Sequence, residues 1–98
     1  MDQRKINWTV RALENKFDIF DFWINNNSST KYVEKLEILF NEALKTAAIF
    51  PSAGIPTEIK NVRMILVRNY KIFYRIKPDS IEVITIWDGR RNPKNLKI

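Results

Sequence analysis

The sequence predicts one α+β domain, in which an N-terminal strand and a helical hairpin precede a three-stranded antiparallel meander, with the helices packed on one face of the sheet. Three observations predict this fold class. Apolar residues recur at helical spacing up to residue 50, and the period changes to two after residue 60. A chain of 98 residues also has no room for two separate cores. The single domain is therefore expected to span residues 1–98.

The first two elements are a short strand and a helix. Gln3 to Trp8 alternates between polar and apolar residues and predicts a strand. Thr9 follows as a plausible N-cap for a helix. The apolar stripe of this helix is expected to comprise Leu13, Phe17, Phe20 and Ile24.

A polar turn and a second helix come next. Residues 25–29, of sequence NNNSS, interrupt the first helix, and Ser29 or Thr30 can cap the second. Its apolar stripe is expected to comprise Val33, Leu36, Phe40, Ala43 and Ala47. Phe50-Pro51 ends this helix, because the residue before a proline is disfavoured in helical angles. The two helices should therefore form a hairpin, and residues 51–56 a connecting loop.

Three strands are predicted after this loop, at Val62–Val67, Tyr70–Lys77 and Ile81–Asp88. The first two are joined by a tight turn at Arg68-Asn69, in which Asn69 is expected to take positive φ. Residues 78–80 form the next turn, and residues 89–98 a basic tail.

The alternation of these strands assigns side chains to two faces. In the middle strand, Tyr70, Ile72, Tyr74 and Ile76 lie opposite Lys71, Phe73 and Arg75. In the last strand, Val83, Thr85 and Trp87 are expected opposite Glu82, Ile84 and Ile86. Tyr70 and Tyr74 are therefore expected in the core. The face that the helices leave uncovered, here called the open face, carries the cations.

The composition excludes several kinds of site. The chain has neither cysteine nor histidine, so disulfides and the usual metal ligands are absent, and no metal or cofactor is expected. The N-terminal segment has no apolar run typical of a signal peptide or membrane span, which predicts a cytoplasmic protein without a membrane partner.

Positive charge is concentrated in the second part of the chain. Residues 1–59 hold 7 Lys and Arg against 8 Asp and Glu, whereas residues 60–98 hold 10 against 3. A merely solvated sheet face usually mixes the two signs of charge, so this asymmetry favours a surface that binds a target. The alternative is that the alternating cations only solvate the exposed side of the sheet.

Several segments, in order, resemble the RelE/ParE superfamily, the plasmid stabilisation toxins of type II toxin–antitoxin systems. They are Trp8-Thr9, Phe50-Pro51 with Gly54, the run Tyr70–Ile76, and residues 88–93 of sequence DGRRNP. The resemblance covers nearly the whole chain. It implies a RelE/ParE-like fold and a toxin that causes growth arrest through a surface on its sheet. It also implies a cognate antitoxin protein that wraps around the toxin, with DNA contacted only through the antitoxin complex.

The resemblance distinguishes the branches of the superfamily less clearly. Lys71 and Arg91 match two phosphate-binding positions of the mRNA-cutting members, and these two would be catalytic only if the chain is a ribonuclease. Arg63 stands alone where those members carry paired cations. No tyrosine follows Tyr74, whereas many cutting members have one near the C-terminus. The ending that contains Arg90 and Arg91 is closer to the gyrase-directed ParE branch.

Six residues are the candidates for binding a target or a nucleic acid: Arg63, Lys71, Phe73, Arg75, Arg90 and Arg91. Arginine offers paired donors suited to phosphate. Lys71, Arg75 and the Arg90/Arg91 pair are expected to converge on the open face.

The other groups near these cations have two possible roles each. Phe73, the apolar member of the Lys71/Arg75 face, either stacks on a base or fills the space under the tail. Glu82 and Asp88 either act as a base or pair with neighbouring arginines, and structural pairing is favoured. Lys71 is either a base or an ordinary exposed lysine. The base and acid of any RNA cleavage are therefore left open.

Three functions follow from these alternatives. Inhibition of DNA gyrase by binding is slightly favoured, because it needs no catalytic groups. Ribosome-dependent mRNA cleavage, the activity of an mRNA interferase, is the alternative, and the chain would then be a metal-independent endoribonuclease. A non-toxic RNA-binding module is the third. Whether the chain is an enzyme is left open.

Overall fold

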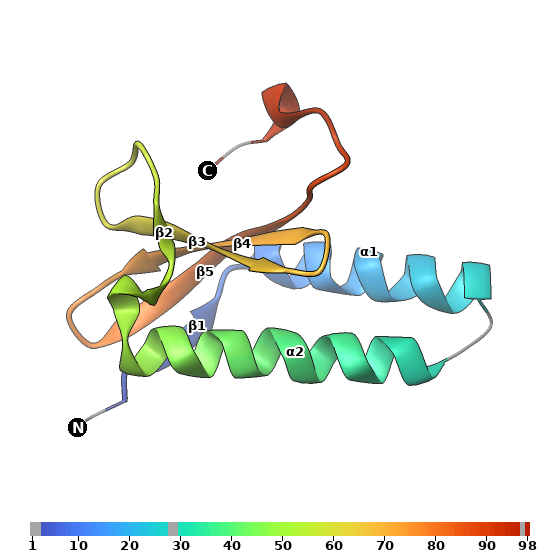
Figure 1. The fold of residues 1–98 in the computed structure, drawn as a ribbon, viewed down its shortest axis with the longest axis horizontal. Helices are drawn as coiled ribbons and strands as arrows, with labels where there is room; N and C mark the ends of the chain where they lie inside the picture. The colour runs from blue at the N-terminus through green and yellow to red at the C-terminus, as the bar shows by residue number, and fades with distance from the viewer. Residues whose placement is uncertain (1–2, 28–29, 97) are drawn as a thin grey trace.

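The computed structural model describes residues 3–27, 30–96 and 98. The elements are β1 (Lys5–Trp8), α1 (Val10–Asn27), α2 (Thr30–Ile49), the 3-10 turn η1 (Pro51–Ala53), β2 (Ile55–Pro56), β3 (Val62–Val67), β4 (Tyr70–Ile76), β5 (Ser80–Asp88) and the 3-10 turn η2 (Pro93–Asn95). One sheet has the strand order β1-β5-β4-β3-β2. β1 runs parallel to β5, and the other neighbours are antiparallel. In Figure 1, α2 lies on one side of the sheet and the C-terminal tail on the other.

The predicted strand, hairpin and meander are therefore confirmed, with one addition to the sheet. The two-residue strand β2 lies in the predicted loop, and it extends the sheet by pairing with Met64 and Arg63. Thr9 caps α1 as expected, because its Oγ1 accepts the backbone N–H of Ala12 at 3.1 Å. Ser29, one of the two candidate caps of α2, lies outside the described residues, and Thr30 is already helical.

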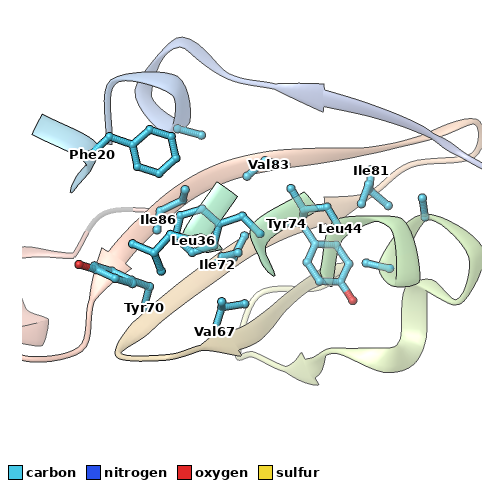
Figure 2. Packing of buried hydrophobic residues seen from close by; sticks show 14 residues of the cluster. Phe20, Leu36, Leu44, Val67, Tyr70, Ile72, Tyr74, Ile81, Val83 and Ile86 are labelled. Atoms are coloured by element: carbon cyan, nitrogen blue, oxygen red, sulfur yellow. The ribbon is translucent and has the colours of Figure 1, made fainter. Parts of the chain in front are cut away.

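The main core lies between the helical hairpin and one face of the sheet. Among the described residues it comprises fourteen buried side chains: Ala12, Phe20, Leu36, Phe40, Leu44, Ala47, Ala48, Val67, Tyr70, Ile72, Tyr74, Ile81, Val83 and Ile86. Figure 2 shows Tyr70 and Tyr74 at opposite ends of this cluster. They are 2% and 0% exposed, which confirms that both tyrosines belong to the core.

The rotation of α1 differs from the prediction. Phe17 and Ile24 were expected on the buried stripe, but they are 56% and 39% exposed. The physical reason is a polar contact: the Asn15 Oδ1 accepts the Thr85 hydroxyl at 2.7 Å and the Ile86 N–H at 3.1 Å. A half-buried amide oxygen that satisfies two donors of β5 turns the Asn15 side of α1 toward the sheet.

The turn between β3 and β4 is confirmed, but its left-handed residue is not the expected one. Arg68 has a φ of 57°, whereas Asn69 is not among the described residues with positive φ. The prediction for Asn69 is therefore wrong. The arginine takes a conformation that is disfavoured for a residue with a Cβ atom.

The alternation in β5 is broken by a bulge. Phe73 pairs with Thr85 and Tyr74 pairs with Val83, so β5 has one more residue than β4 between these two pairs. An extra residue reverses the faces of all residues that follow it. Ile86 therefore joins the main core with Val83, while Trp87 joins Ile84 on the open face. The predicted grouping of Trp87 with Val83 is wrong for this reason.

Tyr74 fixes the loop that precedes β2. Its hydroxyl donates to the Pro51 carbonyl oxygen at 2.5 Å and accepts the Gly54 N–H at 3.0 Å. A Cβ atom at Gly54 would lie 2.6 Å from that hydroxyl oxygen, so no larger residue fits without displacing the ring. The glycine predicted as a loop marker is therefore required by the close approach of Tyr74.

Candidate functional site

A second, smaller apolar cluster lies on the open face. Its buried members are Val62, Phe73, Ile84 and Trp87, with Met64 and Leu96 packed against them. Leu96 belongs to the tail, which crosses this side of the sheet (Figure 1). Phe73 is only 6% exposed. Its ring therefore fills the space under the tail, one of its two expected roles, and offers little surface for stacking on a base.

Two of the candidate cations meet at Trp87. Lys71 lies opposite Trp87 in the register of β4 and β5. Residues paired in this way have Cβ atoms about 5 Å apart. From the tail, the guanidinium carbon of Arg91 lies 4.8 Å from the centroid of the Trp87 ring. A cation at this distance is attracted by the negative face of the indole. Lys71 and Arg91 therefore border the same indole, and the three residues are here called the Trp87 site.

Arg75 belongs to a separate group of charges. Its Nε lies 3.7 Å from Glu82, and the same carboxylate lies 3.4 Å from the Nζ of Lys77. Arg75 is four residues beyond Lys71 on β4, which is about 13 Å along an extended strand. The side chain of Phe73 is buried between them. The structural pairing expected of Glu82 is confirmed, and Arg75 does not join the Trp87 site.

Arg63 lies on the other face of the sheet. It is paired with Tyr74, which points into the main core. Its Nη1 donates to the carbonyl oxygens of Ser52 at 3.1 Å and Gly54 at 2.8 Å. The guanidinium therefore holds the loop before β2, and it lies apart from the other candidate cations.

Arg90 is held by a carboxylate at the end of β5. Its Nε and Nη2 donate to the two oxygens of Asp88 at 3.1 and 2.9 Å, and its backbone N–H donates to Oδ1 at 2.9 Å. These hydrogen bonds hold the pKa of Asp88 below its usual range, and they raise the pKa of Arg90. The pairing expected of Asp88 is confirmed. The four cations expected to converge do not form one cluster: Lys71 is paired with Trp87, over whose ring Arg91 lies, whereas Arg75 pairs with Glu82 and Arg90 with Asp88.

The pKa shifts of Tyr70, Tyr74 and Asp88 make these groups poorly suited to proton transfer near neutral pH. Burial raises the pKa of Tyr70 and of Tyr74 above the ordinary value for a phenol. The pKa of Asp88 moves in the opposite direction, downward. All three shifts lead away from neutral pH, whereas a general acid or base works best when its pKa lies near the working pH.

Residues 3–27, 30–96 and 98 offer neither a metal site nor a membrane-spanning helix. No group of three or more acidic residues there is placed to hold a metal ion. None of the helices in this part of the chain is long and apolar enough to cross a membrane.

Trp87 is the site residue that the sequence did not reveal. Strict alternation placed it with Val83, and only the bulge brings it to the open face. The sequence nevertheless holds one signal for this contact: Trp87 precedes Arg91 by four residues, and Arg91 lies near the start of the basic tail.

Comparisons with known proteins agree with this architecture. A family model described as "ParE toxin of type II toxin-antitoxin system, parDE" matches residues 6–93. A solved structure titled "Chromosomal ParDE TA system from P. aeruginosa" is similar in fold, with a TM-score of 0.71 and 20% sequence identity over 86% of this chain and 94% of that chain. No curated protein matches the chain.

Proposed function

The chain belongs to the ParE toxin family of type II toxin–antitoxin systems, and from this premise we propose that it arrests growth by binding and inhibiting DNA gyrase, without chemistry of its own. As a toxin of such a system, it has an antitoxin as its cognate partner. Gyrase is the target that the resemblance of the tail to the ParE branch implies.

One observation carries the choice of binding over catalysis: the carboxylates nearest the cations are already engaged. Asp88 is paired with Arg90, and Glu82 with Arg75 and Lys77. The lowered pKa of Asp88 means that this carboxylate has little tendency to take a proton near neutral pH. RNA cleavage without a metal needs a group that accepts the proton of the 2′-hydroxyl. A site that only binds has no such requirement.

The Trp87 site supplies what binding does require. Lys71 and Arg91 flank one indole, and Arg91 is exposed while it stacks on the ring. Arginine and tryptophan are enriched among the residues that contribute most to protein–protein affinity. Cations grouped in this way fit an acidic surface of a large protein target.

Cleavage of mRNA is the second candidate, and a specific observation favours it. Of the two residues that match phosphate-binding positions of the cutting members, Lys71 is paired with Trp87 across β4 and β5, and Arg91 lies over the Trp87 ring. The missing tyrosine after Tyr74 counts against it. The third interpretation, a non-toxic RNA-binding module, depends in part on the Phe73 ring stacking on a base. This ring is only 6% exposed, which counts against that role.

The two candidate activities are separated by two assays of the same purified protein. We expect the chain to inhibit the supercoiling of plasmid DNA by gyrase and to leave mRNA on programmed ribosomes intact. Codon-specific cuts together with normal supercoiling would overturn the proposal in favour of the alternative.

Paired variants test the Trp87 site. Lys71→Ala combined with Arg91→Ala removes both cations and should weaken gyrase inhibition at least about 10-fold, since interface residues of this kind contribute upward of 1 kcal/mol each. Lys35→Ala combined with Lys45→Ala is the control, because it removes the same charge from exposed positions of α2. Equal inhibition by the two double variants would exclude the Trp87 site and leave only a general effect of net charge.

A further inference from the structure

A hollow lies between α1 and the end of the sheet, and of the three residues of the Trp87 site only Arg91 lines it. It encloses about 160 Å³. Its lining comes from α1, β4 and the residues after β5: Asp18, Ile19, Phe22, Tyr70, Asp88, Arg90 and Arg91. Ile19, Phe22 and the ring of Tyr70 give it a largely apolar wall.

An array of aromatic side chains holds this wall in place. The Trp23 indole N–H donates to the Tyr70 hydroxyl at 2.7 Å. The rings of Phe22 and Tyr32 meet the Trp23 ring edge-on, with centroids 5.2 and 4.7 Å away. Such contacts fix the ring positions before any ligand arrives. Phe22 nevertheless stays 48% exposed at the hollow.

The two rims of the hollow carry opposite charge. Asp18 lies on the α1 rim, and Arg90 and Arg91 lie on the β5 rim. Arg90 already donates to both oxygens of Asp88, so its positive charge is neutralised by that carboxylate. Arg91 rests on the Trp87 ring. A ligand that brings a carboxylate should therefore place it beside Arg91 and away from Asp18.

The size and lining of the hollow suit one large apolar side chain. A cavity of about 150 Å³ with apolar walls accommodates a benzene molecule. A preformed apolar recess with a charged rim is a typical site for the residue that contributes most to a protein interface. Since the chain has a net charge of +6, a partner that neutralises it should be acidic.

We propose that this hollow receives one large apolar side chain from an acidic segment of the cognate antitoxin, and that a neighbouring carboxylate of that segment pairs with Arg91. This inference rests on the assignment of the chain as a toxin, but it does not depend on the toxin's target. The exposed ring of Phe22 becomes covered when the antitoxin binds.

Two phenylalanines of α1 provide a matched test. Phe22 and Phe17 are exposed to similar extents, 48% and 56%, but only Phe22 lines the hollow. In a titration of the purified toxin with the antitoxin encoded beside it, Phe22→Ala should weaken binding at least 10-fold, and Phe17→Ala less than twofold. Equal losses for the two variants, or no loss for Phe22→Ala, would overturn the inference.

A second readout separates the hollow from the target site. Without antitoxin, Phe22→Ala should inhibit gyrase as well as the parent does, and added antitoxin should no longer restore supercoiling at the concentration that suffices for the parent. Lost inhibition with intact antitoxin binding would assign the hollow to the target instead. If the parent itself fails to inhibit gyrase, the proposed function is rejected, but the titration still decides the inference.

The indole N–H signals in a nitrogen-15 correlation spectrum give a test that needs no variant. The three tryptophans are Trp8, Trp23 and Trp87, and Trp23 donates to the hydroxyl of Tyr70, a residue that lines the hollow. Added antitoxin should shift the Trp23 signal strongly and the Trp8 signal little. A spectrum in which the Trp23 signal stays in place at saturation would contradict the inference.

Discussion

The two faces of the sheet are closed in different ways. On one face, fourteen buried side chains among the described residues pack beneath two long helices. On the open face, four buried side chains pack beneath a tail whose regular structure is one 3-10 turn of three residues. β4 contributes to both faces, with Ile72 pointing to the first and Phe73 to the second. One strand can therefore contribute to a large, helix-covered core on one face and to a small, thinly covered cluster on the other.

The two clusters should also differ in how readily they open. A cluster covered by a short segment can lose that cover without unfolding of the rest, because local opening requires breaking only the contacts of that segment. The main core has no such route, since its cover is the helical hairpin itself. We therefore expect the helix-covered face to set the global stability, and the open face to respond locally.

The largest effect is expected in the main core. Ile72 is fully buried, and Ile72→Ala should lower the free energy of unfolding by about 3–4 kcal/mol, because the surrounding helices and strands cannot collapse into the space. Urea denaturation followed by circular dichroism measures this change. A loss below about 1 kcal/mol would show that this face is as adaptable as the other.

The neighbouring residue on the opposite face should be less sensitive. Phe73→Ala removes a larger side chain, yet we expect a loss of about 2 kcal/mol, below the usual range for buried phenylalanine, because the tail can settle into the space. The same denaturation experiment measures it. If Phe73→Ala costs as much as Ile72→Ala, the two faces do not differ in the way described above.

A smaller effect is expected where the tail itself makes contact. Leu96 is half-buried against the open-face cluster, so Leu96→Ala should cost about 1 kcal/mol or less of global stability. Amide hydrogen exchange should show faster exchange in the tail, with the protection of β4 and β5 unchanged. Faster exchange throughout the sheet would mean that the tail is part of the global folding unit.

The smallest effect concerns the ion pair at the end of β5. The pKa of Asp88 is lower in the folded chain than its ordinary value of about 3.9, so its contribution to stability is fully present above that pH. The contribution is lost as the pH falls through the folded value. Asp88→Asn should therefore flatten the decline in the denaturation midpoint below about pH 4. An identical decline in parent and variant would show that the Arg90 pairing adds nothing to the fold.

Much of the fold could be predicted from local patterns. The helical stripe of α2 and the alternation of β4 both place the expected residues in the core, since each pattern depends only on the element that carries it. The rotation of α1 could not be predicted in this way. It is set by hydrogen bonds from β5 to Asn15, whose partners lie 70 and 71 residues away.

The candidate site shows the same limit. Lys71 and Phe73 lie on the face that alternation predicts. Arg90 and Arg91 are neighbours in the sequence, yet Asp88 holds the first and Trp87 attracts the second. The sign of a side chain's charge can be read from the sequence, but the residue with which that side chain pairs depends on contacts formed only in the folded chain.

The extra residue at Ile84 divides β5 into two halves with independent periodicity. Before Ile84, the faces of the apolar residues are set by contacts with β1 and the helical hairpin. After Ile84, the face on which Trp87 lies can change without changing the face on which Val83 lies. An insertion or deletion there would exchange Ile86 and Trp87 between the main core and the open face in one step. One such change would therefore remodel the open face and the adjoining part of the main core together, while the part of β5 that pairs with β1 keeps its faces.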